Sequence, residues 1–140
     1  LDEIGSGSAA DAARAIDYAV AAGARVVNAS WTMTADPALE AAVGRARDAG
    51  VVIVAAAGND GTDLDASPVY PAGYARRYDN VVAVASADAD RLAASSNYGR
   101  ATVALAAPGV NVESTLPGGR YGRRSGTSTA AGVVSGAVSL

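Results

Sequence analysis

One stretch constrains the fold more than any other: residues 51–56 read Val-Val-Ile-Val-Ala-Ala, without a polar side chain. Gly50 precedes this run and Gly58 closes the apolar segment. A strand with one face in water alternates apolar and polar residues, whereas a continuous apolar run is typical of a strand buried on both faces. We therefore expect this strand inside a parallel sheet that is covered above and below.

Two helices are predicted before this strand. Residues 8–23 carry an apolar stripe, Ser8 and Asp11 have the spacing of a capping box, and Gly23 suits the position after a helix. A second helix over 36–50 begins with Asp36 as N-cap and Pro37 at the first helical position.

Short apolar runs predict further strands at 25–29, 81–85 and 102–106. Strands that alternate with helices indicate an α/β fold, with a mostly parallel sheet and helices on both faces. We expect one domain over residues 1–140, since a chain of this length can bury a core.

The end of the chain predicts a helix from about Ser128, with no polar face and therefore buried. Its small residues Gly132, Ser135, Gly136 and Ser139 fall on one side, which would permit close approach to another backbone. Before it, residues 107–122 contain Pro-Gly and Pro-Gly-Gly turns and predict a hairpin-like excursion. Residues 58–79 show no helical pattern, and loops of that length are usually functional.

Composition excludes several classes of chemistry. The 140 residues include no cysteine and no histidine, which removes disulfides, thiolate catalysis, cysteine-bound zinc and the commonest general base. The net charge is −3 and the arginines are scattered, so no basic stripe for nucleic acid is visible. The apolar runs are too short to predict a membrane span.

Gly5-Ser6-Gly7-Ser8-Ala9-Ala10 matches a relaxed dinucleotide-binding fingerprint, and a helix follows it. The next predicted strand ends in Asn28 and Ser30, without the acidic residue that would hold a ribose. A loop with a helix cap is therefore favoured over a nucleotide site.

Two polar residues have both a structural and a catalytic interpretation. Ser128 starts a helix, where a hydroxyl residue is most often a cap, but a nucleophile there would gain from the positive helix end. Asn59 follows the buried strand, either as part of a tight turn or as an amide at the edge where such sheets bind ligands. Each residue taken alone favours the structural interpretation.

Taken together and in order, five stretches resemble the subtilases, the family of subtilisin-like serine proteases. The stretches are ARVVNASW, VVIVAAAGNDG, VYPAGY, NVVAVAS and the C-terminal APGVNVESTLPGGRYGRRSGTSTAAGVVSGAVSL. The resemblance covers essentially the whole chain, and the combination of AAAGN, APGV and SGTS at these spacings is highly specific.

The resemblance implies a three-layer subtilisin-like fold and hydrolysis of peptide bonds in peptide or protein substrates. Ser128 matches the nucleophile, and Asn59 matches the asparagine that forms the oxyanion hole with the Ser128 amide. The family's substrate-binding edge corresponds to Ser30, Trp31 and Thr32, and the other wall of its specificity pocket to Ala56, Ala57 and Gly58. Val69 corresponds to a position near the pocket floor. The resemblance also implies a secreted protein; no cofactor is expected, although calcium is common in the family.

This chain departs from the family pattern in ways that affect activity. The Asp and His motifs of the family lie upstream of everything present here, so two of the three triad residues are missing. Thr129 and Gly132 replace the usual Met and Pro, and Thr32 replaces a glycine at the pocket rim. We therefore expect a partial catalytic domain that is inactive alone and needs its upstream part as a partner.

Two alternatives remain open: a non-catalytic peptide-binding domain of the same fold, and the dinucleotide-binding domain. An incomplete domain would also expose a sheet edge, which favours self-association into a homo-oligomer.

Overall fold

The computed structural model describes residues 7–140, and its core is a parallel sheet. Strands β1 (Val26–Ala29), β2 (Val52–Ala56), β3 (Val81–Asp88) and β5 (Leu105–Pro108) run parallel in that order, and β4 (Arg91–Leu92) joins β3 antiparallel. The carboxyl ends of β1 and β2 therefore meet at one edge, where Ser30 and Asn59 follow them.

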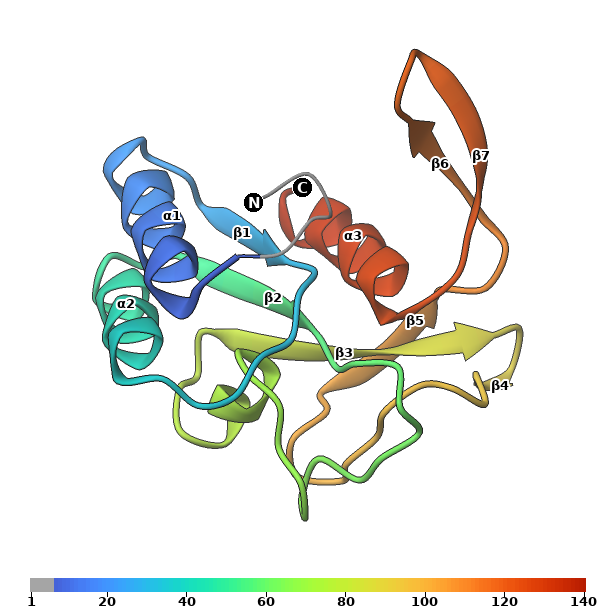
Figure 1. Ribbon diagram of the computed structural model, residues 1–140, viewed down its shortest axis with the longest axis horizontal. Helices are drawn as coiled ribbons and strands as arrows, with labels where there is room; N and C mark the ends of the chain where they lie inside the picture. The colour runs from blue at the N-terminus through green and yellow to red at the C-terminus, as the bar shows by residue number, and fades with distance from the viewer. Residues whose placement is uncertain (1–6) are drawn as a thin grey trace.

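Helices cover both faces of this sheet, as predicted (Figure 1). Helices α1 (Ala9–Ala21) and α2 (Pro37–Asp48) pack on one face, over a core that includes Ile16, Leu39 and Ile53. Helix α3 (Thr127–Val138) packs on the other face, against Val54 and Val84. The α/β, three-layer fold class is confirmed.

The predicted helix boundaries of α1 and α2 are confirmed by their caps. The Ser8 hydroxyl accepts the Asp11 amide, while the Asp11 carboxylate accepts the Ser8 amide, which completes the capping box. Asp36 Oδ1 accepts hydrogen bonds from the first-turn amides of α2. Gly23 has a φ of +80°, the left-handed conformation that ends a helix at low cost for glycine.

The hairpin prediction is also confirmed. Strands β6 (Val112–Leu116) and β7 (Arg120–Arg124) pair antiparallel, and Gly118 and Gly119 make the turn with φ values of +78° and +69°. Figure 1 shows this hairpin extending away from the sheet, beyond the start of α3. In the long loop the only regular element described is a short 3₁₀ helix, Ala72–Arg76.

Two predictions about the C-terminal half differ from the structure. The strand predicted at 102–106 is present but begins only at Leu105, because the amide and hydroxyl of Thr102 donate to Asp65 and not to a neighbouring strand. Helix α3 is buried only along one stripe, and Val133 and Val138 remain 42% and 40% exposed. A Cβ placed at Gly132 or Gly136 would meet nothing within 4 Å, so among residues 7–140 no neighbour requires glycine at either position.

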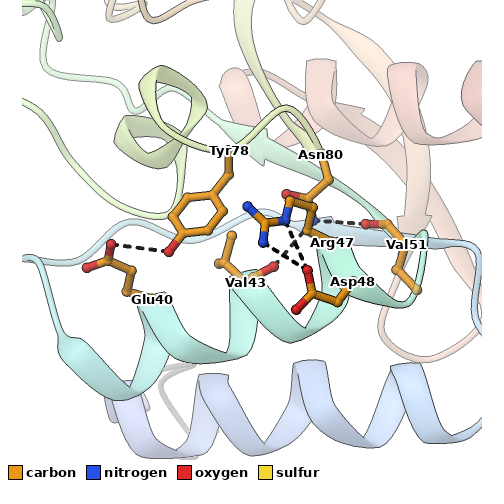
Figure 2. Close-up of polar contacts among 7 residues, drawn as sticks. All are labelled: Glu40, Val43, Arg47, Asp48, Val51, Tyr78 and Asn80. Atoms are coloured by element: carbon orange, nitrogen blue, oxygen red, sulfur yellow. Dashed lines mark hydrogen bonds and ion pairs between the residues drawn. The ribbon is translucent and has the colours of Figure 1, made fainter.

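Figure 2 shows how α2 is fixed to the segment that leads into β3. The Tyr78 hydroxyl donates to Glu40 at 3.3 Å, and the Arg47 guanidinium lies 5.5 Å from the centre of the Tyr78 ring. The buried amide of Asn80 donates to the Val51 carbonyl at 3.0 Å. These contacts fix β3 beside β2 at the end of the sheet remote from Asn59.

A carboxylate in the long loop after β2 ties this loop to a distant segment. Asp65 accepts hydrogen bonds from the Thr102 hydroxyl at 2.7 Å, the Thr102 amide at 3.0 Å and the Ala101 amide at 2.9 Å. The Thr102 hydroxyl, followed by the Ala101 amide, lowers the pKa of Asp65 below its ordinary value. The loop that carries Asn59 is thereby tied to residues 99–102.

Candidate active site

Ser128 lies in the first turn of α3 but does not cap it. The N-cap is Gly126, with a φ of +134°, and no side chain at that position caps the helix. The exposed Ser128 hydroxyl instead donates to the Ser30 carbonyl at 3.2 Å, and the Ser30 hydroxyl donates back to the Ser128 carbonyl at 3.0 Å. This reciprocal pair joins the start of α3 to the residue that follows β1.

Asn59 supplies the cap that α3 lacks. Its Oδ1 accepts the Thr127 amide at 2.9 Å and the Thr127 hydroxyl at 3.2 Å. A backbone amide can only donate, so the oxygen of the Asn59 side chain must face Thr127. The Asn59 Nδ2 group therefore points the other way, and it makes no hydrogen bond to any residue between 7 and 140.

Thr127 links the loop to the helix, and the sequence prediction missed it. Its side chain is 0% exposed, and its hydroxyl accepts the Gly58 amide at 3.0 Å while donating to Asn59. The only sequence signal was its position between Gly126 and Ser128, which gives no hint of a partner 69 residues earlier in the chain.

Two glycines close to Ser128, Gly109 and Gly126, have close neighbours where a side chain would lie. The Gly126 amide donates to the Gly109 carbonyl at 2.7 Å. A Cβ at Gly109 would lie 2.3 Å from the Ser86 hydroxyl, and a Cβ at Gly126 would lie 3.3 Å from Asn59 Oδ1. The segment Ala107-Pro108-Gly109 thus packs against the chain where it enters α3.

A cavity of about 210 Å³ brings most of the predicted site residues together. The predicted residues on its wall are Ser30, Trp31, Thr32, Ala56, Gly58, Asn59 and Ser128. Asp60 and Thr127 also line it and were not predicted. The edge at 30–32 lies outside the strands of the sheet, and Met33 beside it pairs with Tyr70 in an isolated antiparallel bridge.

Ala57 and Val69 do not line this cavity. Ala57 is 0% exposed and packs in the core under α1 and α2, because successive side chains of an extended segment point to opposite sides. Val69 is partly buried and packs against the same core. The proposed wall therefore reduces to Ala56 and Gly58.

Ser128 also borders a second cavity, of about 390 Å³, between α3 and the β6–β7 hairpin. It is lined by Ser114, Arg124 and Thr129, among others. Ser128 therefore lies between two cavities on the surface of the domain.

The site has no histidine to act as base, and the described part of the chain has no cluster of potential metal ligands. The sequence contains no histidine. Across residues 7–140 no group of three or more acidic side chains could hold a metal ion, so we derive no calcium site. No helix in the same range is long and apolar enough to cross a membrane.

The nucleotide fingerprint is only partly covered, since Gly5 and Ser6 lie outside the described residues. Ser8, which belongs to the same fingerprint, is the N-cap of α1, and its hydroxyl accepts the Asp11 amide. Its hydroxyl is therefore already engaged in the cap that the sequence favoured.

Comparisons with known proteins agree with this geometry. A sequence model of the subtilase family matches residues 2–140. The chain is 44% identical to a thermophilic serine proteinase of Bacillus sp. (strain AK1), covering 100% of this chain and 33% of the relative. It is 37% identical to subtilisin E of Bacillus subtilis (strain 168), covering 100% of this chain and 36% of the relative.

Solved structures show the same likeness. The prenylagaramide maturation protease PagA superposes with a TM-score of 0.83 at 34% identity, over 94% of this chain and 48% of that one. A cold-adapted subtilisin-like serine proteinase gives 0.82 at 32% identity, over 96% and 50%. The chain thus spans between a third and a half of the length of these relatives, and it belongs to the subtilase family.

Proposed function

We propose that this chain supplies the nucleophile and the oxyanion hole of a serine endopeptidase. One observation carries the proposal: Asn59 and Ser128 line the same cavity. Asn59 is held there because its Oδ1 accepts a hydrogen bond from the amide of Thr127, the residue before Ser128. Family membership supports a serine protease in the longer protein.

In the proposed reaction, Ser128 Oγ attacks the carbonyl carbon of a peptide bond. The negative charge that develops on the carbonyl oxygen is held by Asn59 Nδ2 and by the Ser128 amide, whose first-turn position leaves it without a partner inside the helix. A peptide backbone would pair with the edge at 30–32, which lies outside the strands of the sheet.

The proton of Ser128 needs a base, and histidine, the usual base beside a serine nucleophile, is absent from this chain. We therefore propose that the acid and base come from the remainder of a longer protein, and that these 140 residues alone do not hydrolyse peptides. An extracellular setting and peptide or protein substrates are proposed on the family alone.

Labelling with a fluorophosphonate tests the assignment of the nucleophile. In the longer protein we expect the probe to modify the peptide that contains Ser128, as mapped by mass spectrometry, because only an activated serine reacts. The matched control is Ser135→Ala, a serine on the same helix whose hydroxyl donates to Asn28; this variant should label normally. Labelling that survives Ser128→Ala would overturn the assignment.

A non-catalytic peptide-binding domain is the second candidate, and the edge at 30–32, which lies in none of the described strands, favours it equally. It differs in one respect: it needs no base. Binding of extended peptides by the longer protein, with no labelling and no hydrolysis, would select this candidate.

We also propose that the open edge of β1 and the exposed side of α3 contact the rest of the longer protein, and contact a second copy when this chain is alone. Among the described strands β1 pairs only with β2, and Val133 and Val138 are exposed on α3. Both features leave backbone groups or apolar surface unpaired.

Light scattering of the isolated chain should therefore report a mass above that of the monomer, increasing with concentration. Val133→Asp places a charge on the open side of α3 and should shift the equilibrium toward monomer. A monomer at high concentration in the unaltered chain would contradict self-association.

A further inference from the structure

Asn97 is a buried polar residue whose side-chain hydrogen bonds all reach the loop that carries Asn59. Its side chain is 0% exposed. Its Nδ2 donates to the Ala57 carbonyl at 2.9 Å, and its Oδ1 accepts the amides of Asp60 at 2.9 Å and Thr62 at 3.0 Å. Its backbone amide donates to the Gly58 carbonyl at 2.9 Å.

These four hydrogen bonds bracket Asn59 without touching its side chain. Gly58 adopts a φ of +103° and lies so close that a Cβ there would be 2.4 Å from Asn97 Nδ2. The turn at Gly58 directs Asn59 toward Thr127, and Asn97 holds the backbone on both sides of that turn. The amide of Asn59 therefore has its direction fixed from two sides, by Thr127 and by Asn97.

Asn97 is itself fixed to the sheet. The neighbouring Ser96 hydroxyl accepts the Ser86 amide of β3 at 2.9 Å and donates to the Asn97 carbonyl at 2.9 Å. On the other side, Tyr98 forms a parallel bridge with Asp63. The support behind the loop is thus hydrogen-bonded to β3, and a preorganised donor requires such support.

We propose that Asn97 is a positioning residue for the oxyanion hole, acting on the reaction through Asn59. It lines neither cavity beside Ser128 and so makes no contact with substrate. A hydrogen-bond donor helps catalysis only if it already points at the atom where charge develops. Without Asn97, the side chain of Asn59 would no longer be held in that orientation. The effect on catalysis rests on the proposed function, whereas the effect on the loop does not.

Kinetics of Asn97→Ala in the longer protein test the catalytic part. We expect kcat to fall about tenfold or more, up to the roughly 10²–10³ that removal of one oxyanion donor costs in subtilisin, with KM little changed. In an Asn59→Ala background the same substitution should change kcat by less than about threefold, because the donor that Asn97 positions is gone. Effects that multiply would overturn the proposal.

Asn80→Ala is the matched control. Asn80 is also a buried asparagine whose amide donates to backbone carbonyls, those of Val43 and Val51, but it lies at the other end of the sheet (Figure 2). It should lower stability and leave kcat unchanged. An equal loss of kcat in both variants would reduce Asn97 to a general structural role.

Amide hydrogen exchange tests the same idea without any activity. The Thr127 amide is bonded to Asn59 Oδ1 and has no contact with Asn97. In Asn97→Ala we expect this amide to exchange faster than in the unaltered chain and in Asn80→Ala. Unchanged exchange at Thr127 in a folded variant would overturn the proposal, while absence of Ser128-dependent hydrolysis would count only against the proposed function.

If the alanine variant does not fold, Asn97→Asp can replace it in these experiments. The aspartate keeps the oxygen that accepts the Asp60 and Thr62 amides. Its protonated form can also donate to the Ala57 carbonyl, as the asparagine does. As pH falls, the activity of the variant and the protection of its Thr127 amide from exchange should therefore recover, each measured relative to the unaltered protein. If the ratio of variant to unaltered protein does not change with pH, this would count against a positioning role.

Discussion

Ser128→Ala is expected to lower the kcat of the longer protein by about 10⁶, which would leave roughly 10³–10⁴ over the uncatalysed reaction. This magnitude is the one measured in subtilisin, a relative of this chain, and is carried over from it. The physical reason is that no covalent intermediate can form without the hydroxyl, while the donors and the binding edge remain. The measurement is turnover of a chromogenic peptide under saturating conditions.

The fold should survive this substitution, so the loss can be read as chemistry. Ser128 is exposed, its hydroxyl makes one hydrogen bond to the Ser30 carbonyl, and the return bond uses the Ser128 backbone. We expect the free energy of unfolding to change by no more than about 0.5 kcal/mol. A decrease in kcat of less than tenfold would mean that Ser128 is not the nucleophile.

Local patterns were sufficient to predict the elements that support the site. The caps at Ser8 and Asp36, the run at 51–56 and the turn at 117–119 each act over a few residues, and the structure has all of them. One interpretation of Asn59 placed its amide at the edge where such sheets bind ligands, because it follows a strand of a parallel sheet. Family resemblance then separated Ser128 and Asn59 from their structural interpretations.

What could not be predicted depends on contacts between distant segments. The Thr127 hydroxyl meets Gly58 across 69 positions, and Asn97 meets Ala57 across 40. No periodicity within either segment encodes such a pair. The same limit explains α3, whose sequence has no polar face although only the stripe through Ala130 and Val134 packs on the sheet.

Asn59→Ala is expected to lower kcat by about 10²–10³ with little change in KM, a magnitude taken from the loss of one oxyanion donor in subtilisin. The amide acts only once charge develops on the carbonyl oxygen, so its loss affects the transition state and not the bound substrate. Alanine also removes the acceptor for the Thr127 amide, which should cost about 1 kcal/mol of stability as the loss of a helix cap.

Asn59→Asp separates these two contributions of the one side chain. A carboxylate still accepts the Thr127 amide, and its negative charge at the start of α3 should maintain or raise stability, by about 0.3–1 kcal/mol. The same charge lies where the oxyanion must form, and the donor is lost, so kcat should fall at least as far as in Asn59→Ala. Thermal unfolding and steady-state kinetics, measured on both variants, should therefore show kcat falling in both while stability falls only in Asn59→Ala. If Asn59→Asp kept its activity, the contribution of Asn59 would be confined to capping α3, and the oxyanion would have to be held by the Ser128 amide without it.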